Sequence, residues 1–398
     1  PMDILLHFYK HTNDDKLKHI QRICQKYWEL NSNKKFKFKI KNICEEEGIT
    51  EKELRRIINE YCHAYTKDVL CCVCNKIYLS FNSRYDFLDK IRNYNRSLSK
   101  GWVCKNCLDE NKRREEEKAK NKEIEKYEFL LNIINERQSD YIDINEIKFD
   151  NAVFLLSTIR ILASENLEFL YPYKKSKYSL SPTTTFDNNI LAQLLDHDLI
   201  LIHPEYSLDF VTLKSDRSFQ YYPFKVYWLL PLSGKGESNA RFIERLEDAI
   251  KSDDWPDSWY DECDELCRKV CLHECFQYLH LCLERHGFQH NIGEKTELII
   301  NQALDNFSVG QLYNFIWKAS RDAASLYMRG GMSKRHAANC VPGSIQRTAD
   351  RALAEGWDVK AFHRDFQTPQ SIVSNVLFNI YIFFYSFNCL LSNTFNFF

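Results

Sequence analysis

The sequence predicts a mainly α-helical protein built from several domains. Apolar residues recur at helical spacing near the front and through the rear of the chain, and glycine and proline are scarce, at 11 and 9 of 398 residues. Two Cys-x-x-Cys motifs interrupt the helical pattern and indicate a small metal-dependent module. A chain of this length has room for two or three domains.

Residues 2–68 are expected to form a trihelical helix-turn-helix. The stretch 15–31 places its apolar side chains at helical spacing. A second, short helix is expected to end at Gly48, because glycine readily takes the positive φ found after a helix end. Thr50 and Glu53 then form a T-x-x-E capping box that starts the third helix. Over about 28 positions these residues resemble the general helix-turn-helix pattern.

The third helix is expected to expose a polar face. Its members are Glu51, Lys52, Arg55, Arg56, Asn59 and His63. In a DNA-binding helix-turn-helix this helix enters the major groove, where arginine reads guanine and asparagine reads adenine. The acidic residues on the same helix leave an alternative open, a trihelical module that binds a protein.

A basic run, KKFKFKIK, covers residues 34–41 and favours the DNA-binding interpretation. Its cationic members are Lys34, Lys35, Lys37, Lys39 and Lys41. Five lysines within eight residues are suited to phosphate contacts, which supply most non-specific affinity for nucleic acid.

Residues 69–110 are expected to form a zinc module. The ligands would be Cys71 and Cys74 from one motif, with Cys104 and Cys107 from the other. Four thiolates suit tetrahedral Zn²⁺ and leave no position for water, so the site would be structural. Cys72 is an alternative to Cys71, although it would leave one residue between the ligands. A knuckle on a turn and another at a helix start resemble the treble-clef and zinc-ribbon classes.

The central part of the chain separates into a spacer and a mixed module. Residues 111–137 are mostly charged and predict a solvated spacer helix. Residues 138–235 predict an α+β, winged-helix-like module, with a helix at 188–197, then LILI, then one aromatic strand within 219–232. Few cations accompany this module, which favours a structural role over a second DNA-contacting wing.

Residues 236–366 predict a helical domain with many polar side chains near its end. The helix at 259–285 carries Cys263, Cys267, Cys271 and Cys275 in four-residue steps, and a straight helix cannot bring all four sulfurs to one ion. Packing is therefore the favoured interpretation of these cysteines. Within the polar set at 309–366, which predicts a catalytic pocket or a partner surface, Arg329 and His336 are weak candidates for the active site of an all-helical nuclease.

The segment 367–398 contains no charged residue. Its apolar core, Val376–Leu391, would span about 24 Å as a helix, short of the roughly 30 Å hydrocarbon core of a membrane. A buried terminal element or a partner-covered surface is favoured over a membrane-acting tail.

The distribution of charge indicates where a polyanion would bind. Residues 1–126 hold 28 Lys+Arg against 20 Asp+Glu, and the remainder holds 26 against 35. The 15 cysteines and the absence of a secretory signal pattern after the first residues predict a cytoplasmic protein with free thiols. The favoured function is a zinc-stabilised protein that binds duplex DNA, with an acidic helical half that senses, oligomerises or recruits a protein. A transcriptional regulator, a mobile-element accessory factor or a phage-defence component would fit this layout. A nuclease effector and a membrane-acting effector are the alternatives.

Overall fold

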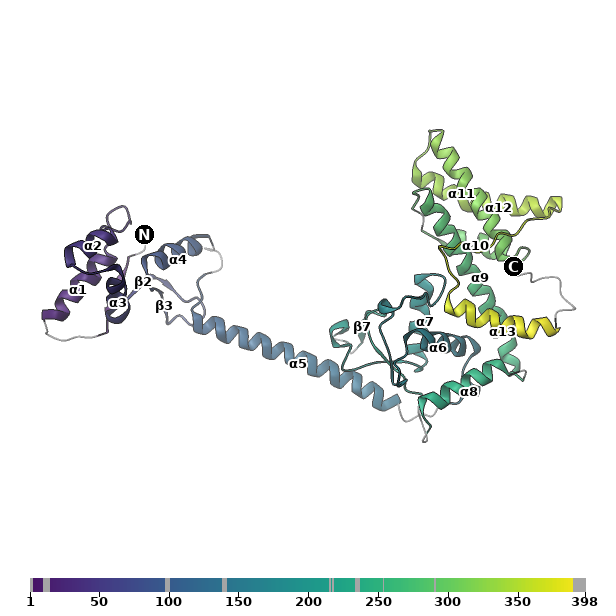
Figure 1. Cartoon of the computed structure of the whole chain (residues 1–398), viewed down its shortest axis with the longest axis horizontal. Coiled ribbons are helices and arrows are strands. Elements are labelled where there is room, and N and C mark those ends of the chain that lie inside the picture. The colour runs from purple at the N-terminus through teal and green to yellow at the C-terminus, as the bar shows by residue number, and fades with distance from the viewer. Residues whose placement is uncertain are drawn as a thin grey trace. The chain divides into compact units, whose positions relative to one another are not determined.

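The computed structural model is mainly helical, which confirms the broad fold class. The described residues are 3–9, 15–96, 101–137, 142–214, 216, 218–232, 237–252, 254–289 and 291–388. They contain thirteen α-helices and three small sheets (Figure 1). The chain divides into two compact units, Pro1–Lys122 (unit 1) and Glu123–Phe398 (unit 2).

Unit 1 consists of helices packed on a three-stranded sheet. Its elements are β1 (Leu5–Phe8), α1 (Asp15–Trp28), α2 (Ile40–Glu47), α3 (Glu51–Tyr61), β2 (Cys62–Leu70), β3 (Tyr78–Phe81), α4 (Arg84–Arg96) and the start of α5 (Lys105–Arg137). The sheet is antiparallel in the order β1-β2-β3. Helices α1, α2 and α3 contact one another, and α1 and α3 also contact β2.

The local signals that predicted the helix-turn-helix are present in the structure. Gly48 ends α2 at φ 63°, and its N–H bonds to the carbonyl of Cys44. Thr50 and Glu53 form both halves of the capping box, with the Thr50 N–H donating to Glu53 Oε2 at 2.8 Å. Leu54 and Ile58, on the apolar face of α3, are buried in the core of unit 1. The two predicted helices and the turn between them are therefore confirmed.

A buried arginine fixes the basic run against this core. The guanidinium carbon of Arg84 lies 4.5 Å from the ring centres of both Tyr27 and Phe36. Its N–H groups donate to the backbone carbonyls of Tyr27 at 2.7 Å and Phe38 at 2.6 Å. Carbonyl acceptors and ring faces thus replace the water that a buried cation loses, and α4 is tied to α1 and to residues 36–38.

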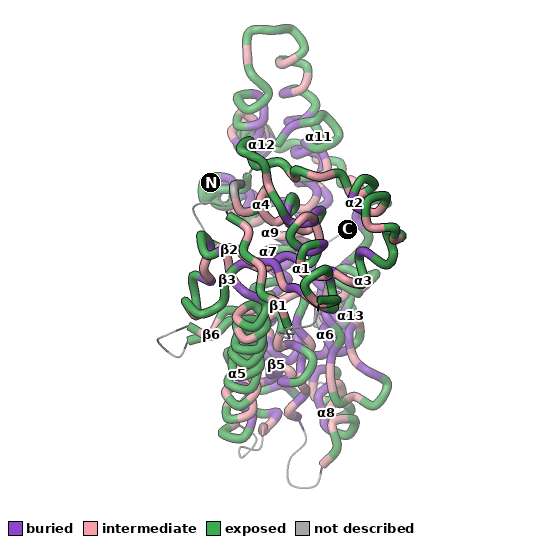
Figure 2. Tube along the Cα trace, turned by 90° about the vertical axis from the view of Figure 1, so that its left-hand side faces the viewer, coloured by how far each residue is buried: buried purple, intermediate pink, exposed green. Residues whose placement is uncertain are grey.

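Helix α5 is exposed along residues 111–125, as Figure 2 shows. Pairs such as Arg114 with Glu110 join charges on neighbouring turns. Leu130 and Ile134, near the end of the helix, are buried in the core of unit 2. Residues 111–125 are therefore solvated, whereas the rear of the predicted spacer, up to residue 137, contributes buried side chains to unit 2.

Unit 2 has a small α+β part followed by a helical part. Its remaining elements are α6 (Phe149–Leu162), β4 (Phe169–Leu170), α7 (Thr184–Asp196), β5 (Leu201–Ile202), β6 (Val211–Leu213), β7 (Phe219–Tyr221), β8 (Trp228–Leu229), α8 (Asn239–Lys251), α9 (Asp257–Arg285), α10 (Glu294–Ala303), α11 (Val309–Met328), α12 (Lys334–Glu355) and α13 (Ile372–Asn388), with short 3₁₀ helices at Ile144–Glu146, Tyr173–Lys175 and Leu208–Phe210. Nearly every side chain of α6 is buried, so this helix is the centre of the unit.

The single aromatic strand expected within 219–232 is wrong. Residues 219–221 pair with β6 in a hairpin, whereas Trp228–Leu229 lies between β4 and β5 in a separate sheet. The chain turns between them, where the N–H groups of Lys225 and Val226 both bond to the carbonyl of Tyr222. Pro223 lies at the start of this turn and has no N–H to donate to a sheet.

The helical part contains the expected helices and buries the cysteines of α9. Cys263, Cys267, Cys271, Cys275 and Cys282 are all buried in the core of unit 2, as the packing interpretation predicts. Gly330 and Gly331, at φ 85° and 91°, form the turn between α11 and α12.

One buried carboxylate joins distant segments of unit 2. Glu274, on α9, is 1% exposed and forms an ion pair with Arg364. It also accepts hydrogen bonds from the hydroxyl of Tyr313 at 3.3 Å and from Ser374 Oγ at 2.6 Å. The carboxylate is thus held by α11, α13 and the segment that leads to α13.

That leading segment crosses α11 closely at a glycine. The Phe362 N–H donates to the carbonyl of Gly310 at 2.8 Å, and Asn314 Nδ2 donates to the carbonyl of Lys360. A Cβ atom on Gly310 would lie 2.9 Å from the carbonyl oxygen of Phe362. A side chain at this position would therefore force the backbone apart.

Among the described residues, no helix combines the length and the apolar character needed to cross a membrane. Part of the predicted apolar core, residues 389–391, lies outside the described residues.

Candidate metal centre and nucleic-acid surface

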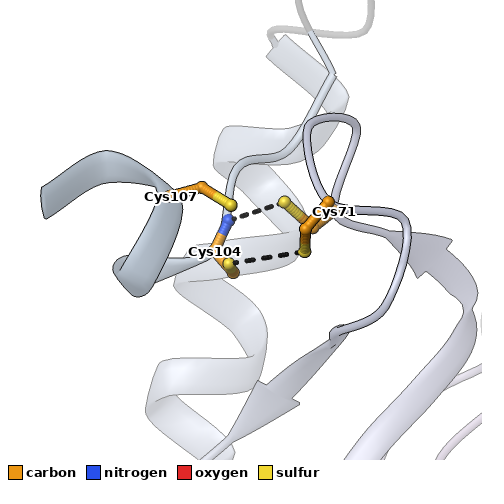
Figure 3. Close-up of side chains that lie close together, drawn as sticks. Cys71, Cys104 and Cys107 are labelled. Carbon is orange, nitrogen blue, oxygen red and sulfur yellow. Dashed lines mark hydrogen bonds between the residues drawn. The ribbon is translucent and has the colours of Figure 1, made fainter. Parts of the chain in front are cut away.

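Four cysteines of unit 1 bring their sulfur atoms together. Cys71 and Cys74 lie in the loop between β2 and β3, whereas Cys104 and Cys107 lie at the start of α5. All four Sγ atoms fall within 4.8 Å of one another, and Figure 3 shows Cys71, Cys104 and Cys107 converging. This is the quartet that the two Cys-x-x-Cys motifs predicted.

Backbone hydrogen bonds shape both knuckles. The Cys71 N–H donates to the carbonyl of Ile77 at 2.9 Å, which closes the loop after β2. The Asn75 N–H bonds back to the carbonyl of Cys71 at 3.0 Å, and Asn75 takes a φ of 53°. In the second knuckle the Leu108 N–H donates to the carbonyl of Cys104, so the first helical bond of α5 sets the turn that carries Cys104 and Cys107.

The spacing of the sulfurs fits a tetrahedral metal ion. A metal–sulfur distance of about 2.3 Å places tetrahedral thiolates about 3.8 Å apart, and Cys74 Sγ lies 3.9 Å from Cys104 Sγ. The Cys104 N–H also donates to Cys71 Sγ at 3.3 Å, a contact that favours a thiolate. The donor set and its geometry therefore fit a group such as Zn²⁺.

The protonation chemistry of the quartet points the same way. Burial alone would raise the pKa of Cys71, but N–H groups of Cys104 and Cys74 donate to its sulfur, and the pKa falls to about 6. A hydrogen bond with the Cys104 sulfur, reinforced by burial, raises the pKa of Cys107 to about 12. Metal binding needs the sulfurs as thiolates, so a bound cation would displace the protons of these thiols.

Cys72, the alternative ligand, lies outside the quartet. Its side chain is exposed, and its N–H donates to the carbonyl of Trp102 at 2.9 Å. The Cβ and Sγ of Cys72 also lie 3.0 Å from where a side chain on Gly101 would begin. Cys71, rather than Cys72, therefore completes the four-sulfur group.

Helix α3 exposes the side chains predicted to read DNA bases. Lys52, Arg55, Arg56 and Asn59 are all exposed. Arg55 and Arg56 are held by long ion pairs to Glu51 at 4.0 Å and Glu60 at 3.9 Å. Exposed pairs at this separation contribute little to stability, so both guanidinium groups can exchange these partners for other acceptors.

The lysines of the basic run divide into two groups. Lys34, Lys37 and Lys41 pair with Asp3, Glu29 and Glu45, at 2.6, 2.5 and 3.7 Å. Lys35 and Lys39 are exposed and form no ion pair with any described residue. All five lie on the loop before α2 or on its first turn.

One residue expected on the face of α3 lies elsewhere. Helix α3 ends at Tyr61, and His63 is part of β2, paired with His7 of β1. The expectation for His63 is wrong because the burial pattern changes here from helical spacing to strict alternation, with Cys62, Ala64 and Thr66 buried. The alternation indicates a strand, and a strand places the side chains of His63 and Tyr65 on the face opposite to the buried ones.

The weak nuclease candidates are both exposed. Arg329 ends α11 and His336 lies in the first turn of α12, with the Gly-Gly turn between them. In the described residues no hydrogen bond or ion pair joins their side chains. Two other polar residues of the segment 309–366 form ion pairs within unit 2. Arg364 pairs with Glu274, and Asp365 pairs with Arg285 at 2.9 Å.

Comparison of the chain with protein-family models, with curated proteins and with solved structures finds no match.

Proposed function

We propose that unit 1 is a metal-stabilised head that binds duplex DNA. The observation that carries this proposal is the exposed cationic face of α3, the second helix of a capped helix-turn-helix. Arg55, Arg56 and Asn59 have the chemistry to contact base edges in the major groove. Lys52 adds a cation on the same helix.

The charge of unit 1 supports a polyanionic partner. Residues 1–122 hold 27 Lys+Arg against 18 Asp+Glu, a surplus of nine positive charges. Lys35 and Lys39 would contact phosphates directly. Lys34, Lys37 and Lys41 would do so by exchanging their exposed carboxylate partners for phosphate oxygens.

The metal in this proposal is a structural Zn²⁺ held by Cys71, Cys74, Cys104 and Cys107. When bound, Zn²⁺ would bridge the loop after β2 to the start of α5. Since β2 follows α3 directly, this link would hold the end of the helix-turn-helix in place. Removing the metal would therefore weaken DNA binding as well as local folding.

For unit 2 we propose a sensing, oligomerising or partner-recruiting role. Its residues hold 27 Lys+Arg against 37 Asp+Glu, so the unit is acidic and unsuited to a phosphate backbone. Its buried polar network, centred on Glu274, serves packing.

The test is binding of the full chain to random-sequence duplex DNA across a salt series. Fluorescence anisotropy should show affinity falling as salt rises, because phosphate contacts release counterions. Replacing both Arg55 and Arg56 by alanine should weaken binding and reduce the slope of log affinity against log salt by about two, because two cations leave the DNA surface.

A matched double substitution tests whether the effect depends on where the two arginines lie or only on the loss of two positive charges. Arg22→Ala with Arg92→Ala removes two exposed cations from α1 and α4 and leaves α3 unchanged. We expect this variant to bind nearly as well as the parent chain. Equal losses in the two double variants, or affinity that does not respond to salt, would contradict the proposal.

A further inference from the structure

The sheet of unit 1 presents a row of aromatic rings on the face that its helices do not cover. The row consists of His7 on β1, Tyr9 just after β1, His63 and Tyr65 on β2, and Tyr78 at the start of β3. Strand pairing places His7 opposite His63. These residues alternate with buried ones such as Cys62, Ala64 and Leu79, which pack into the core of unit 1.

The rings form one continuous row. Neighbouring ring centres are 6.1 Å apart for His7 and Tyr9, 6.5 Å for Tyr9 and His63, 6.3 Å for His63 and Tyr65, and 6.0 Å for Tyr65 and Tyr78. Tyr9 is 55% exposed and Tyr78 is 38% exposed. The open face of an antiparallel sheet is ordinarily polar, so a row of rings there indicates a binding surface.

The elements that carry the row, and those next to them, also carry cations. Lys67 on β2 and Lys76 in the first knuckle are exposed. Lys90 Nζ lies 3.0 Å from the carbonyl oxygen of Ser80 on β3 and also pairs with Asp86 at 2.9 Å. Asp3 and Asp68 lie at one end of the sheet, where the Asp3 N–H donates to the Asp68 carboxylate. Burial, with smaller effects from His7 and Lys90, lowers the pKa of His63 and so favours its neutral ring.

We propose that this aromatic row binds single-stranded nucleic acid by stacking unpaired bases on the rings. Every base has a flat π face, and aromatic side chains in a positively charged groove are the general means of holding a single strand. The surplus of positive charge on unit 1 and the lysines beside the row would neutralise the phosphates. Duplex DNA cannot use this surface, since its bases are stacked on one another.

The surface is separate from the one proposed for duplex DNA. The aromatic row belongs to β1, β2 and β3, whereas Arg55, Arg56 and Asn59 lie on α3. The two surfaces can therefore succeed or fail independently. Together they would allow unit 1 to hold a site where duplex and single strand meet.

The experiment measures binding of the full chain to single-stranded DNA and single-stranded RNA of mixed sequence, by fluorescence anisotropy. Tyr9→Ala combined with Tyr78→Ala should lower the affinity about 5- to 150-fold for each base that loses its ring. Tyr9→Phe with Tyr78→Phe should keep the affinity, since stacking needs the ring and not the hydroxyl. The two strands separate a preference for DNA from one for RNA.

Tyr85→Ala is the matched control. Tyr85 is 80% exposed on α4 and is not part of the aromatic row, and its loss should leave single-strand binding unchanged. Arg55→Ala with Arg56→Ala should weaken duplex binding and spare single-strand binding, which separates a failure of this proposal from a failure of the duplex proposal.

A second measurement needs no substitution. Photo-crosslinking of bromouracil-containing single strands to the unaltered chain should yield adducts on peptides that contain Tyr9, Tyr65 or Tyr78. Adducts confined to α3 or to unit 2 would overturn the proposal. So would undiminished single-strand affinity in the double alanine variant, or an unaltered chain that binds no single strand.

Discussion

His273 shows how one buried ring can set the pH response of unit 2. Its ring stacks on Phe186, with centres 4.4 Å apart, and its Nδ1 lies 2.8 Å from Thr183 Oγ1. Burial, with a smaller effect from the nearby Lys269 ammonium, lowers the pKa of His273 from 6.5 to about 4. The folded protein therefore holds this ring neutral at a pH where an unfolded chain would protonate it.

This shift predicts a loss of stability in acid. Above pH 6.5 the ring is neutral in both states, and as the pH falls toward 4 the unfolded chain gains a proton that the folded chain refuses. Between pH 7.5 and pH 5 the free energy of unfolding of unit 2 should fall by about 2 kcal/mol through this group. Urea unfolding of the parent chain and of His273→Gln across this range checks it.

The difference in pH dependence between the parent protein and His273→Gln isolates the contribution of His273 from that of other titrating groups. His273→Phe keeps a ring against Phe186, and the comparison with His273→Gln separates packing from titration. Both variants should lose the same part of the pH dependence. Stability curves that stay parallel to the parent curve would contradict the assignment.

Residue-scale signals in the sequence were reliable where the cause was local. Gly48, Thr50 and Glu53 act within a single helix turn, so their spacing alone predicts the end of α2 and the start of α3. Arg84 could not be predicted this way. Its acceptors are carbonyls of Tyr27 and Phe38, more than forty positions earlier in the chain.

At the scale of elements, the four-cysteine group joins a loop to a helix. The loop between β2 and β3 has few backbone bonds of its own, and Cys104 begins a helix whose next four turns are exposed. Val73 and Ile77 in the loop and Leu108 on the helix are all exposed, so these apolar side chains do little to hold the two elements together. A bound ion would therefore supply much of the order in this region.

Metal removal should loosen this region first. A strong chelator, or Cys104→Ser, should increase hydrogen exchange in residues 70–81 and 101–108, while α9 to α12 stay protected. Elemental analysis by mass spectrometry should find one metal ion per chain, with zinc expected from the four-sulfur donor set.

Cys72→Ser is the control for that experiment. It removes a thiol from the same knuckle but leaves the quartet intact. Metal content and exchange in this variant should match the parent chain. If Cys72→Ser releases metal and Cys104→Ser does not, the ligand assignment is wrong.

Strands were harder to predict than helices, because a strand forms only when it pairs with another strand. The motif spacing indicated the cysteine quartet, because the backbone bonds that close each knuckle span no more than seven residues. The sheet of unit 1 depends instead on β1 pairing with β2, some sixty residues apart. The sequence alone does not predict the aromatic row, because strand pairing assembles it and because helical spacing predicts that α3 continues to His63, past its actual end at Tyr61.

At the scale of the whole molecule, each unit has its own core. Ile43, Leu54 and Phe81 belong to one cluster, whereas Phe154, Leu279 and Phe315 belong to the other. The stretch 111–125 of α5 is exposed and belongs to neither cluster. A peptide bond in this stretch can be cut without disturbing either core.

Limited trypsin digestion should therefore cut first within residues 111–126, which are rich in lysine and arginine. Two fragments should persist, and each should melt at nearly the temperature of its unit in the intact chain, because each fragment keeps its own core. Calorimetry of the digest and of the intact chain makes the comparison. Early cleavage inside α9 or α11, or collapse of both fragments, would contradict this division.

The mainly helical character followed directly from the sequence, since helical periodicity extends over many residues in both units. The grouping of elements did not, because it depends on contacts such as Glu274 with Arg364 that span ninety positions. Pro223 had a similar effect on a smaller scale, since it divides one aromatic stretch between two sheets.

The buried carboxylate of Glu274 also has a consequence for synthesis of the chain. Its partner Ser374 lies 100 residues later, and ribosomes add about 5–20 residues per second. For about 5–20 s, therefore, a nascent chain contains Glu274 but not yet the Ser374 hydroxyl that donates a hydrogen bond to it. Unit 2 cannot close until those later residues emerge, whereas unit 1 can already have folded. A ribosome that stalls in this interval would carry a folded unit 1 followed by an incompletely folded, protease-sensitive unit 2.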